Sequence, residues 1–309
     1  MLNKLFYEEK GLFFQGFHPL SGLAYLSTLL VLALVFNHPL YLAGLLLVLG
    51  LAIWAAKGLA VWENYLKIGL AMMGLIMLIN PLMTRAGGTI IWYGPLIPVF
   101  GRLTISLEAI YYGVAMSIRL LDIISVFCLY NLIVHPDQVL NLFSRFASKS
   151  TLVISLATRM FPVMAARLED IKGVQQTRGV DLSKGSRKEI AKKYFSLINN
   201  LLISSLEDSL EIAESMQARA FGSGPRSCYR RNLWRPRDTL CLSGSAVALG
   251  AGIWGLHHGF SVYNYYPQMD CLVNGPETVA ILLIVIFTLS FPAALSWGWQ
   301  FCPYLKSKI

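Results

Sequence analysis

Long runs of apolar residues recur along the chain in two groups separated by a more polar segment. A helix needs about 20 apolar residues to cross a hydrocarbon core of ~30 Å. The candidate spans are Leu20–Phe36, Leu40–Ala56, Leu66–Met83, Ile105–Val134, Leu240–His258 and Thr278–Trp297. The pattern predicts an all-α polytopic membrane helix bundle of about six spans. Because Leu152–Ala166 and Tyr194–Leu210 are also partly apolar, the expected number carries a margin of one or two.

The segment from Pro136 to Arg237 has a helical period instead, and contains no uncharged run long enough to span a membrane. A 4-3-4-3 spacing relates Met164, Leu168, Ile171, Gln175 and Arg178, and a similar spacing relates Leu202, Leu206, Leu210 and Ala213. We interpret these stretches as long amphipathic coupling helices lying at the cytoplasmic face. Pro162 suits a first helical turn, and Gly179 and Gly222 suit C-terminal stops.

The same pattern divides the chain into three parts. Residues 1–135 form an N-terminal group of transmembrane helices, residues 136–237 the cytoplasmic segment, and residues 238–309 a C-terminal group of transmembrane helices.

Composition supports a membrane protein. The chain of 309 residues is 55% hydrophobic and 14% charged, and its mean hydropathy is +0.56. Soluble domains contain about 25% charged residues, so neither a single soluble globule nor a disordered chain fits.

The net charge of +9 comes from one segment, because 17 Lys and Arg against 8 Asp and Glu lie between Arg145 and Arg237. If the N-terminus is cytoplasmic, 23 of the 26 basic residues also face the cytoplasm, as the positive-inside rule requires. We therefore expect a multi-pass protein of a cell membrane with both termini in the cytoplasm, and no nucleic-acid partner.

Motifs for catalysis or metal binding are missing from the sequence. There is no GxxxxGK[ST] loop, and the segment Ser148–Thr151 lacks the glycines that would cradle a phosphate. The five cysteines form no CxxC pair, and the five histidines show no metal-ligand spacing. We expect no enzymatic activity, no metal site and no cofactor in this chain, so any ATP and Mg would be bound by partner subunits.

Two arginines, each flanked by small residues, end the amphipathic stretches: Thr177-Arg178-Gly179 and Ala218-Arg219-Ala220. The helix dipole alone favours a cation there by about 0.3–1 kcal/mol, which would explain one such arginine. The recurrence favours a second interpretation. Small neighbours allow close approach to a partner, and the guanidinium can then bond carboxylates or carbonyls in a groove.

Several segments resemble the transmembrane T component of energy-coupling factor transporters, a family that includes cobalt-transport proteins. They are FHPL at 17–20, INPL at 79–82, LEAIYYG at 107–113, LYNLIVHPDQVLNLFSRF at 129–146, ATRMFP at 157–162 and both arginine tripeptides. Thr177 stands where the family usually has alanine, and Ala220 where glycine is frequent. Neither change removes an arginine or adds much bulk.

The resemblance implies a scaffold that takes up vitamins or transition metals together with partner proteins. In the family, the two arginines dock into two ABC-type ATPases, a homodimer or heterodimer, and the scaffold passes their motion to a substrate-binding S component in the same prokaryotic membrane. Arg178 and Arg219, with their neighbours Thr177, Gly179, Ala218 and Ala220, would thus couple the chain to the ATPases.

Three charged residues fall in the fourth predicted span: Glu108, Arg119 and Asp122. A charge at the centre of a membrane costs about 2.5–3.5 kcal/mol on insertion scales. Arg119 and Asp122 are three residues apart and could pair on one helical face. We interpret the three as an intramembrane ion pair or as part of the S-component interface.

Two other classes of protein compete with this interpretation. A stand-alone secondary carrier or channel would contain inverted repeats with broken helices, and no internal repeat is evident beyond the two arginine helix ends. A membrane-embedded lipid-modifying enzyme would contain clustered Asp or His, and the chain has no DxxD or HxxxH motif.

Overall fold

The computed structural model describes most of the chain in two compact units, each described here by itself. The described ranges are 16–84, 87–97, 101–134, 138–139, 142, 148–181, 185–224, 234–267, 269–273 and 275–301. One unit, the membrane unit, is drawn from Met1–Val139 and Leu233–Ile309, and the other, the coupling unit, from Leu140–Asn232.

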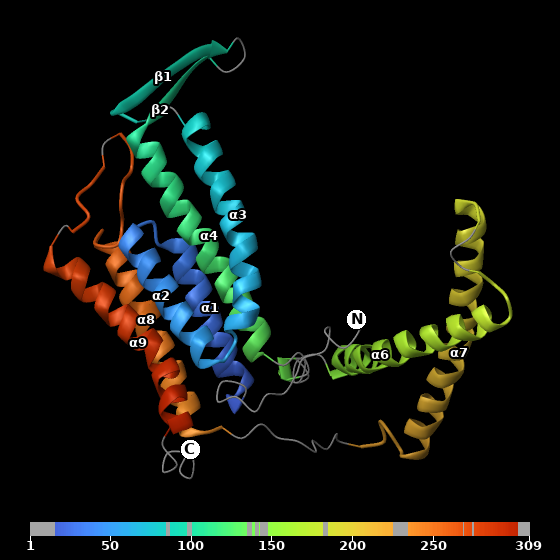
Figure 1. The fold of residues 1–309 in the computed structure, drawn as a ribbon. Helices are drawn as coiled ribbons and strands as arrows, with labels where there is room; N and C mark the ends of the chain where they lie inside the picture. Colours follow the sequence, from blue (N-terminus) through green and yellow to red (C-terminus); the bar gives the residue numbers. More distant parts are fainter. Residues whose placement is uncertain are drawn as a thin grey trace. The chain divides into compact units, whose positions relative to one another are not determined.

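The membrane unit is a bundle of helices with one hairpin (Figure 1). Its elements are α1 (Pro19–Val35), α2 (Pro39–Ala55), α3 (Leu59–Met83), β1 (Ile90–Ile97), β2 (Gly101–Ser106), α4 (Leu107–Ile133), α8 (Pro236–His257) and α9 (Pro276–Phe301). Each predicted span corresponds to one of these helices. By length and composition α3, α4, α8 and α9 are candidate spans, whereas α1 and α2 are shorter apolar helices. The all-helical membrane architecture is thereby confirmed.

Two histidine–proline pairs start the short helices in the same way. His18 precedes α1 and His38 precedes α2, and each Nδ1 accepts a hydrogen bond from the backbone N–H two residues on, at 3.3 Å. Proline occupies the first helical position in both, where its missing N–H leaves no internal bond unmade. The sequence thus fixes both helix starts locally.

The core of the membrane unit lies around α1 and α2, which pack against α4, α8 and α9. Two tyrosines inside this core have their hydroxyls satisfied by distant backbone. The Tyr25 hydroxyl donates to the Leu289 carbonyl and the Tyr41 hydroxyl to the Thr278 carbonyl, both at 2.9 Å. These bonds remove the cost of burying a polar group and fix α9 against the two short helices.

The antiparallel hairpin β1–β2 was not among the sequence predictions. It connects α3 to α4 (Figure 1). The Gly88 N–H donates to the Pro267 carbonyl at 3.1 Å, and the Tyr265 hydroxyl donates to the Asn37 carbonyl at 2.8 Å. The hairpin, the α1–α2 turn and the α8–α9 loop therefore lie at one end of the unit, which we call the hairpin end.

The opposite end, the clasp end, is held by Asp238 at the start of α8. Its carboxylate accepts hydrogen bonds from the His18 N–H at 2.8 Å, the Ser21 hydroxyl at 3.2 Å and the Arg235 N–H at 2.9 Å. Arg237 adds a bond to the Gly16 carbonyl. One buried carboxylate thus satisfies donors at the start of both α1 and α8.

The coupling unit contains two long helices, α6 (Ser148–Thr177) and α7 (Arg187–Ala218). They are antiparallel, since Leu156 and Ser215 line one recess between them and Val180 and Leu197 another. Between the two helices, Arg167 of α6 donates to the Ser204 hydroxyl of α7 at 2.6 Å and forms an ion pair with Asp208.

Two details of α6 bear on the sequence predictions. Pro162 lies inside the helix and not in its first turn, because the helix already begins at Ser148. The part from Ser150 onward is also long and apolar enough to qualify as a candidate span, although only 6% of it is buried. The sequence margin of one or two spans already covered this stretch, because Leu152–Ala166 is partly apolar, and the cytoplasmic assignment of α6 stays a prediction.

The two predicted apolar faces have different environments. Met164, Leu168, Ile171 and Gln175 are all half-buried. Leu202, Leu206 and Leu210 remain exposed, and α7 instead buries Leu197 and Ser205. The predicted stripe on α7 is therefore an uncovered surface of the coupling unit.

Candidate coupling site

The end of α6 is a Schellman motif centred on the first predicted arginine. The Val180 N–H donates to the Gln175 carbonyl and the Gly179 N–H to the Gln176 carbonyl, both at 3.0 Å. Gly179 has φ +84°, the left-handed conformation that this motif requires at the residue after the cap. Arg178 is therefore the cap residue of α6, one position beyond its last helical residue.

The end of α7 repeats this geometry. The Phe221 N–H donates to the Met216 carbonyl at 3.0 Å and the Ala220 N–H to the Gln217 carbonyl at 2.9 Å. Ala220 adopts φ +54°, so an alanine occupies the left-handed position that glycine occupies in α6. Arg219 is again the cap residue. The two helix ends are far apart in sequence, yet each carries an arginine in the same backbone conformation.

Both arginine side chains are available to a partner. Arg178 and Arg219 are exposed, as are Thr177, Gly179, Ala218 and Ala220. Within the described part of the chain neither guanidinium makes a hydrogen bond or an ion pair. The Thr177 hydroxyl bonds back to the Val174 carbonyl at 2.8 Å, which satisfies its one donor inside the helix.

The two arginines lie at different ends of the helix pair. Val180, next to the first arginine, shares a recess with Leu197. From Leu197 to Arg219 the chain continues as α7, which at 1.5 Å per residue covers about 33 Å. The coupling unit therefore presents two separate sites and not one joint cluster.

Sequence reasoning found both arginines but placed one helix stop wrongly. Gly222 was expected to end α7, yet the helix ends at Ala218, and Ala220 is the left-handed residue. The sequence did contain a signal for the true end of α7. The two helix ends share a glutamine, an arginine and a closing apolar residue, in Gln176-Thr177-Arg178-Gly179-Val180 and Gln217-Ala218-Arg219-Ala220-Phe221. The Schellman motif often includes such a closing apolar contact.

The three charged residues predicted near the fourth span are held by different partners. Arg119 donates to the Phe36 carbonyl at 2.6 Å and to the Asn37 side chain. Asp122 is fully buried, and neither carboxyl oxygen has a hydrogen-bond partner in the described chain. The predicted ion pair between them does not form, because the arginine extends toward the end of α1.

Glu108 has a separate position at the base of the hairpin. One carboxylate oxygen accepts hydrogen bonds from the Thr89 N–H at 3.0 Å and the Thr89 hydroxyl at 2.6 Å. These bonds tie the residue just before β1 to the first turn of α4. In the described residues no group of three or more His, Cys, Asp or Glu side chains could hold a metal ion.

Comparisons with known proteins agree with a membrane transport protein. Residues 19–228 match the model of the CbiQ family, cobalt transport protein. The energy-coupling factor transporter transmembrane protein EcfT of Exiguobacterium sibiricum is 31% identical over 52% of this chain and 65% of its own length. The EcfT protein of Staphylococcus aureus is 25% identical over 52% of this chain and 62% of its own length. That of Macrococcus caseolyticus is 24% identical over 69% of this chain and 82% of its own length.

The alignments thus span less than two thirds of the first two relatives. The matched family region nevertheless extends from α1 through both arginine helix ends. The chain belongs to the CbiQ cobalt-transport-protein family, and its matched part is similar to the transmembrane proteins of energy-coupling factor transporters.

Proposed function

We propose that this chain is the non-catalytic coupling scaffold of an energy-coupling factor importer. It would bind two cytoplasmic ABC-type ATPases through Arg178 and Arg219 and pass their motion to a membrane S component that binds a vitamin or a transition metal. ATP and Mg would be held by the ATPases, and both termini of this chain would be cytoplasmic. The similarity to transmembrane proteins of energy-coupling factor transporters supports this assignment.

The observation that carries the proposal is the duplicated helix end. Each end fixes the backbone of an arginine by two hydrogen bonds while its side chain stays exposed and unpaired in the described chain. The fixed backbone lowers the entropy that the helix end loses on docking, and the exposed guanidinium can bond carboxylates or carbonyls in a groove. About 33 Å of α7 separates the two arginine ends, so each end could contact a different subunit of one ATPase dimer.

The test is co-purification with candidate ATPases, comparing wild type with Arg178→Ala/Arg219→Ala. Losing one partly buried charge-assisted contact costs on the order of 2–5 kcal/mol, so the double variant should lose both the ATPases and substrate uptake. The matched control is Arg187→Ala/Lys188→Ala, which removes two exposed positive charges from the start of α7 and should retain the ATPases.

Undiminished ATPase recovery with the arginine variant would contradict the coupling role. A wild-type chain that purifies alone and transports substrate in liposomes would favour the competing stand-alone carrier. Turnover of a lipid by the purified chain would favour the membrane-embedded enzyme.

A further inference from the structure

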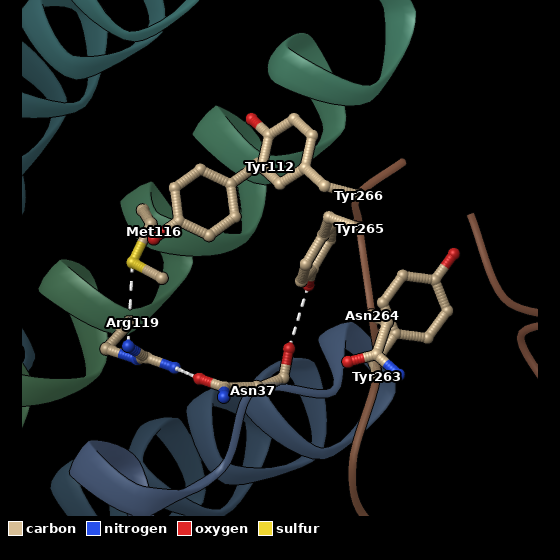
Figure 2. A pocket seen from close by; sticks show the side chains of 8 residues that line it. All are labelled: Asn37, Tyr112, Met116, Arg119, Tyr263, Asn264, Tyr265 and Tyr266. Atoms are coloured by element: carbon tan, nitrogen blue, oxygen red, sulfur yellow. Dashed lines mark hydrogen bonds between the residues drawn. The ribbon is translucent and has the colours of Figure 1, made fainter. Parts of the chain in front are cut away.

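A cavity of about 310 Å³ opens at the hairpin end of the membrane unit. It is lined by Asn37, Tyr112, Met116, Arg119, Tyr263, Asn264, Tyr265 and Tyr266 (Figure 2). These residues come from three segments: the α1–α2 turn, the first half of α4 and the α8–α9 loop. Its volume is at the lower edge of the range for small-ligand sites.

The cavity contains one formal charge. Arg119 is the sole ionised side chain of its lining, and among the described residues it forms no ion pair. One terminal guanidinium nitrogen donates to the Phe36 carbonyl at 2.6 Å and to the Asn37 side chain, and the other contacts the Met116 sulfur at 3.5 Å (Figure 2). One N–H of this second nitrogen is left over, and Nε is buried without a hydrogen-bond partner in the described chain. A positioned guanidinium with unused donors is a binding group for an oxyanion.

The remaining walls are aromatic and rigid. The Tyr112 ring meets the Tyr265 ring edge-on, with centroids 5.3 Å apart, and lies 5.7 Å from the Tyr266 ring. The Tyr265 hydroxyl is bonded to the Asn37 carbonyl at 2.8 Å (Figure 2). Tyrosine rings are typical of the membrane–water interface, and their faces attract ammonium groups.

Helix lengths place this cavity at a lipid headgroup level. α1 has 17 residues, about 26 Å, whereas α4 has 27, about 40 Å. A bilayer responds to a short helix by thinning locally, among other ways, and such thinning brings headgroups toward the end of α1. Leu34 and Val35 in its last turn are exposed apolar residues, and the Phe36 carbonyl just beyond them holds Arg119.

From this geometry we infer that the cavity binds the phosphate group of a phospholipid headgroup, with the phosphate on Arg119, the amine or glycerol part against the tyrosine rings, and the acyl chains along the end of α1. The site differs in position and chemistry from the arginine ends of the coupling unit. It gives the membrane unit a specific lipid at its hairpin end.

The test measures lipid retention by the full chain purified in mild detergent. Native mass spectrometry should detect a phospholipid adduct on the wild type and about tenfold less on Arg119→Gln, as expected for loss of one charge-assisted contact. The matched control is Lys67→Gln, which removes an exposed charge on α3 and should retain the lipid. Asn264→Trp, a change at an exposed lining residue, should block retention without removing a buried contact.

A second arm separates the two sources of phosphate. After delipidation, a short-chain phosphatidylglycerol should raise the melting temperature of wild type but not of Arg119→Gln, and inorganic phosphate should raise neither. Stabilisation by inorganic phosphate with no retained lipid would overturn the lipid assignment. Equal retention by wild type, Arg119→Gln and Asn264→Trp would overturn the site itself.

Discussion

At the residue scale, the two helix ends differ in one side chain that bears on stability. Ala220 adopts a left-handed φ of +54° where Gly179 occupies the same position of the other motif. A Cβ in this conformation costs about 1 kcal/mol relative to glycine. We predict that Ala220→Gly stabilises the end of α7 and slows amide hydrogen exchange there about fivefold, which mass spectrometry of the peptide covering the helix end would measure.

The reverse change provides the control. Gly179→Ala introduces the same strain at φ +84° and should speed exchange at the end of α6 while leaving α7 unchanged. If Ala220→Gly speeds exchange instead, flexibility of the glycine in the open helix end outweighs the relief of strain.

A second residue-scale prediction concerns acid stability. His38 is buried between the rings of Tyr41 and Tyr263, each 5.3 Å away, and its Nδ1 accepts the Leu40 N–H. Burial lowers the pKa of His38 below its usual value, against a smaller opposing effect of a backbone hydrogen bond. The unfolded chain then binds a proton below pH ~6.5 that the folded chain does not, so stability must fall as the pH falls from 6.5 toward the folded pKa.

The measurement is the melting temperature as a function of pH. His38→Asn retains a capping oxygen but cannot titrate here, so it should lose part of the acid sensitivity. His18→Asn, at the equivalent cap of α1, should retain it. An identical pH dependence for wild type and His38→Asn would show that other groups control acid stability.

At the scale of elements, the clasp end depends on one carboxylate. Asp238 is fully buried and accepts from donors that begin α1 and α8, so its removal leaves buried N–H groups of both helices unsatisfied. We predict that Asp238→Ala destabilises the membrane unit by about 3–5 kcal/mol, measured as a lower midpoint of unfolding in fixed detergent. Asp270→Ala, an exposed loop carboxylate bonded to the Asn264 N–H, should cost less than 1 kcal/mol; equal losses would contradict the shared-cap role.

The elements that the sequence predicted well are those determined by local chemistry. The starts of α1 and α2, expected at Leu20 and Leu40, lie one residue earlier at Pro19 and Pro39. The glycine stop after α6 is Gly179, as expected. These positions depend on residues within one turn, so they followed from the sequence. The hairpin was missed because Ile90–Ile97 is apolar with an internal Gly-Pro, a pattern that does not distinguish a strand from a loop. Asp238 was missed because its partner His18 lies 220 residues away, and no local pattern reports such a contact.

The Arg119–Asp122 prediction failed for the same reason. Spacing on one helix showed that the two could meet, but the choice of partner depended on the end of α1, whose carbonyl at Phe36 lies within 2.6 Å of the guanidinium. The arginine helix ends could be predicted because the hydrogen bonds that fix each arginine's backbone lie within the same few residues as the arginine itself.

At the scale of the whole molecule, the orientation in the membrane follows from the ends of the membrane unit. The positive-inside rule predicts a cytoplasmic clasp end, and with it a hairpin end that faces outward. Cys271 lies in the α8–α9 loop at the hairpin end and is exposed and free, whereas Cys128 and Cys241 are buried. We predict that a variant with Cys271 as its sole cysteine, the other four being alanine, reacts with a membrane-impermeant maleimide added to intact cells.

The matched control reports on the other side of the membrane. Thr177→Cys in a background without other cysteines puts a thiol at the exposed end of α6, where the coupling role requires contact with cytoplasmic ATPases. It should react only after the cells are permeabilised. Because the span α8 lies between the two positions, labelling of both thiols from outside would contradict that topology. Labelling of Thr177→Cys alone from outside would invert the orientation and place the arginine ends beyond the reach of any ATPase.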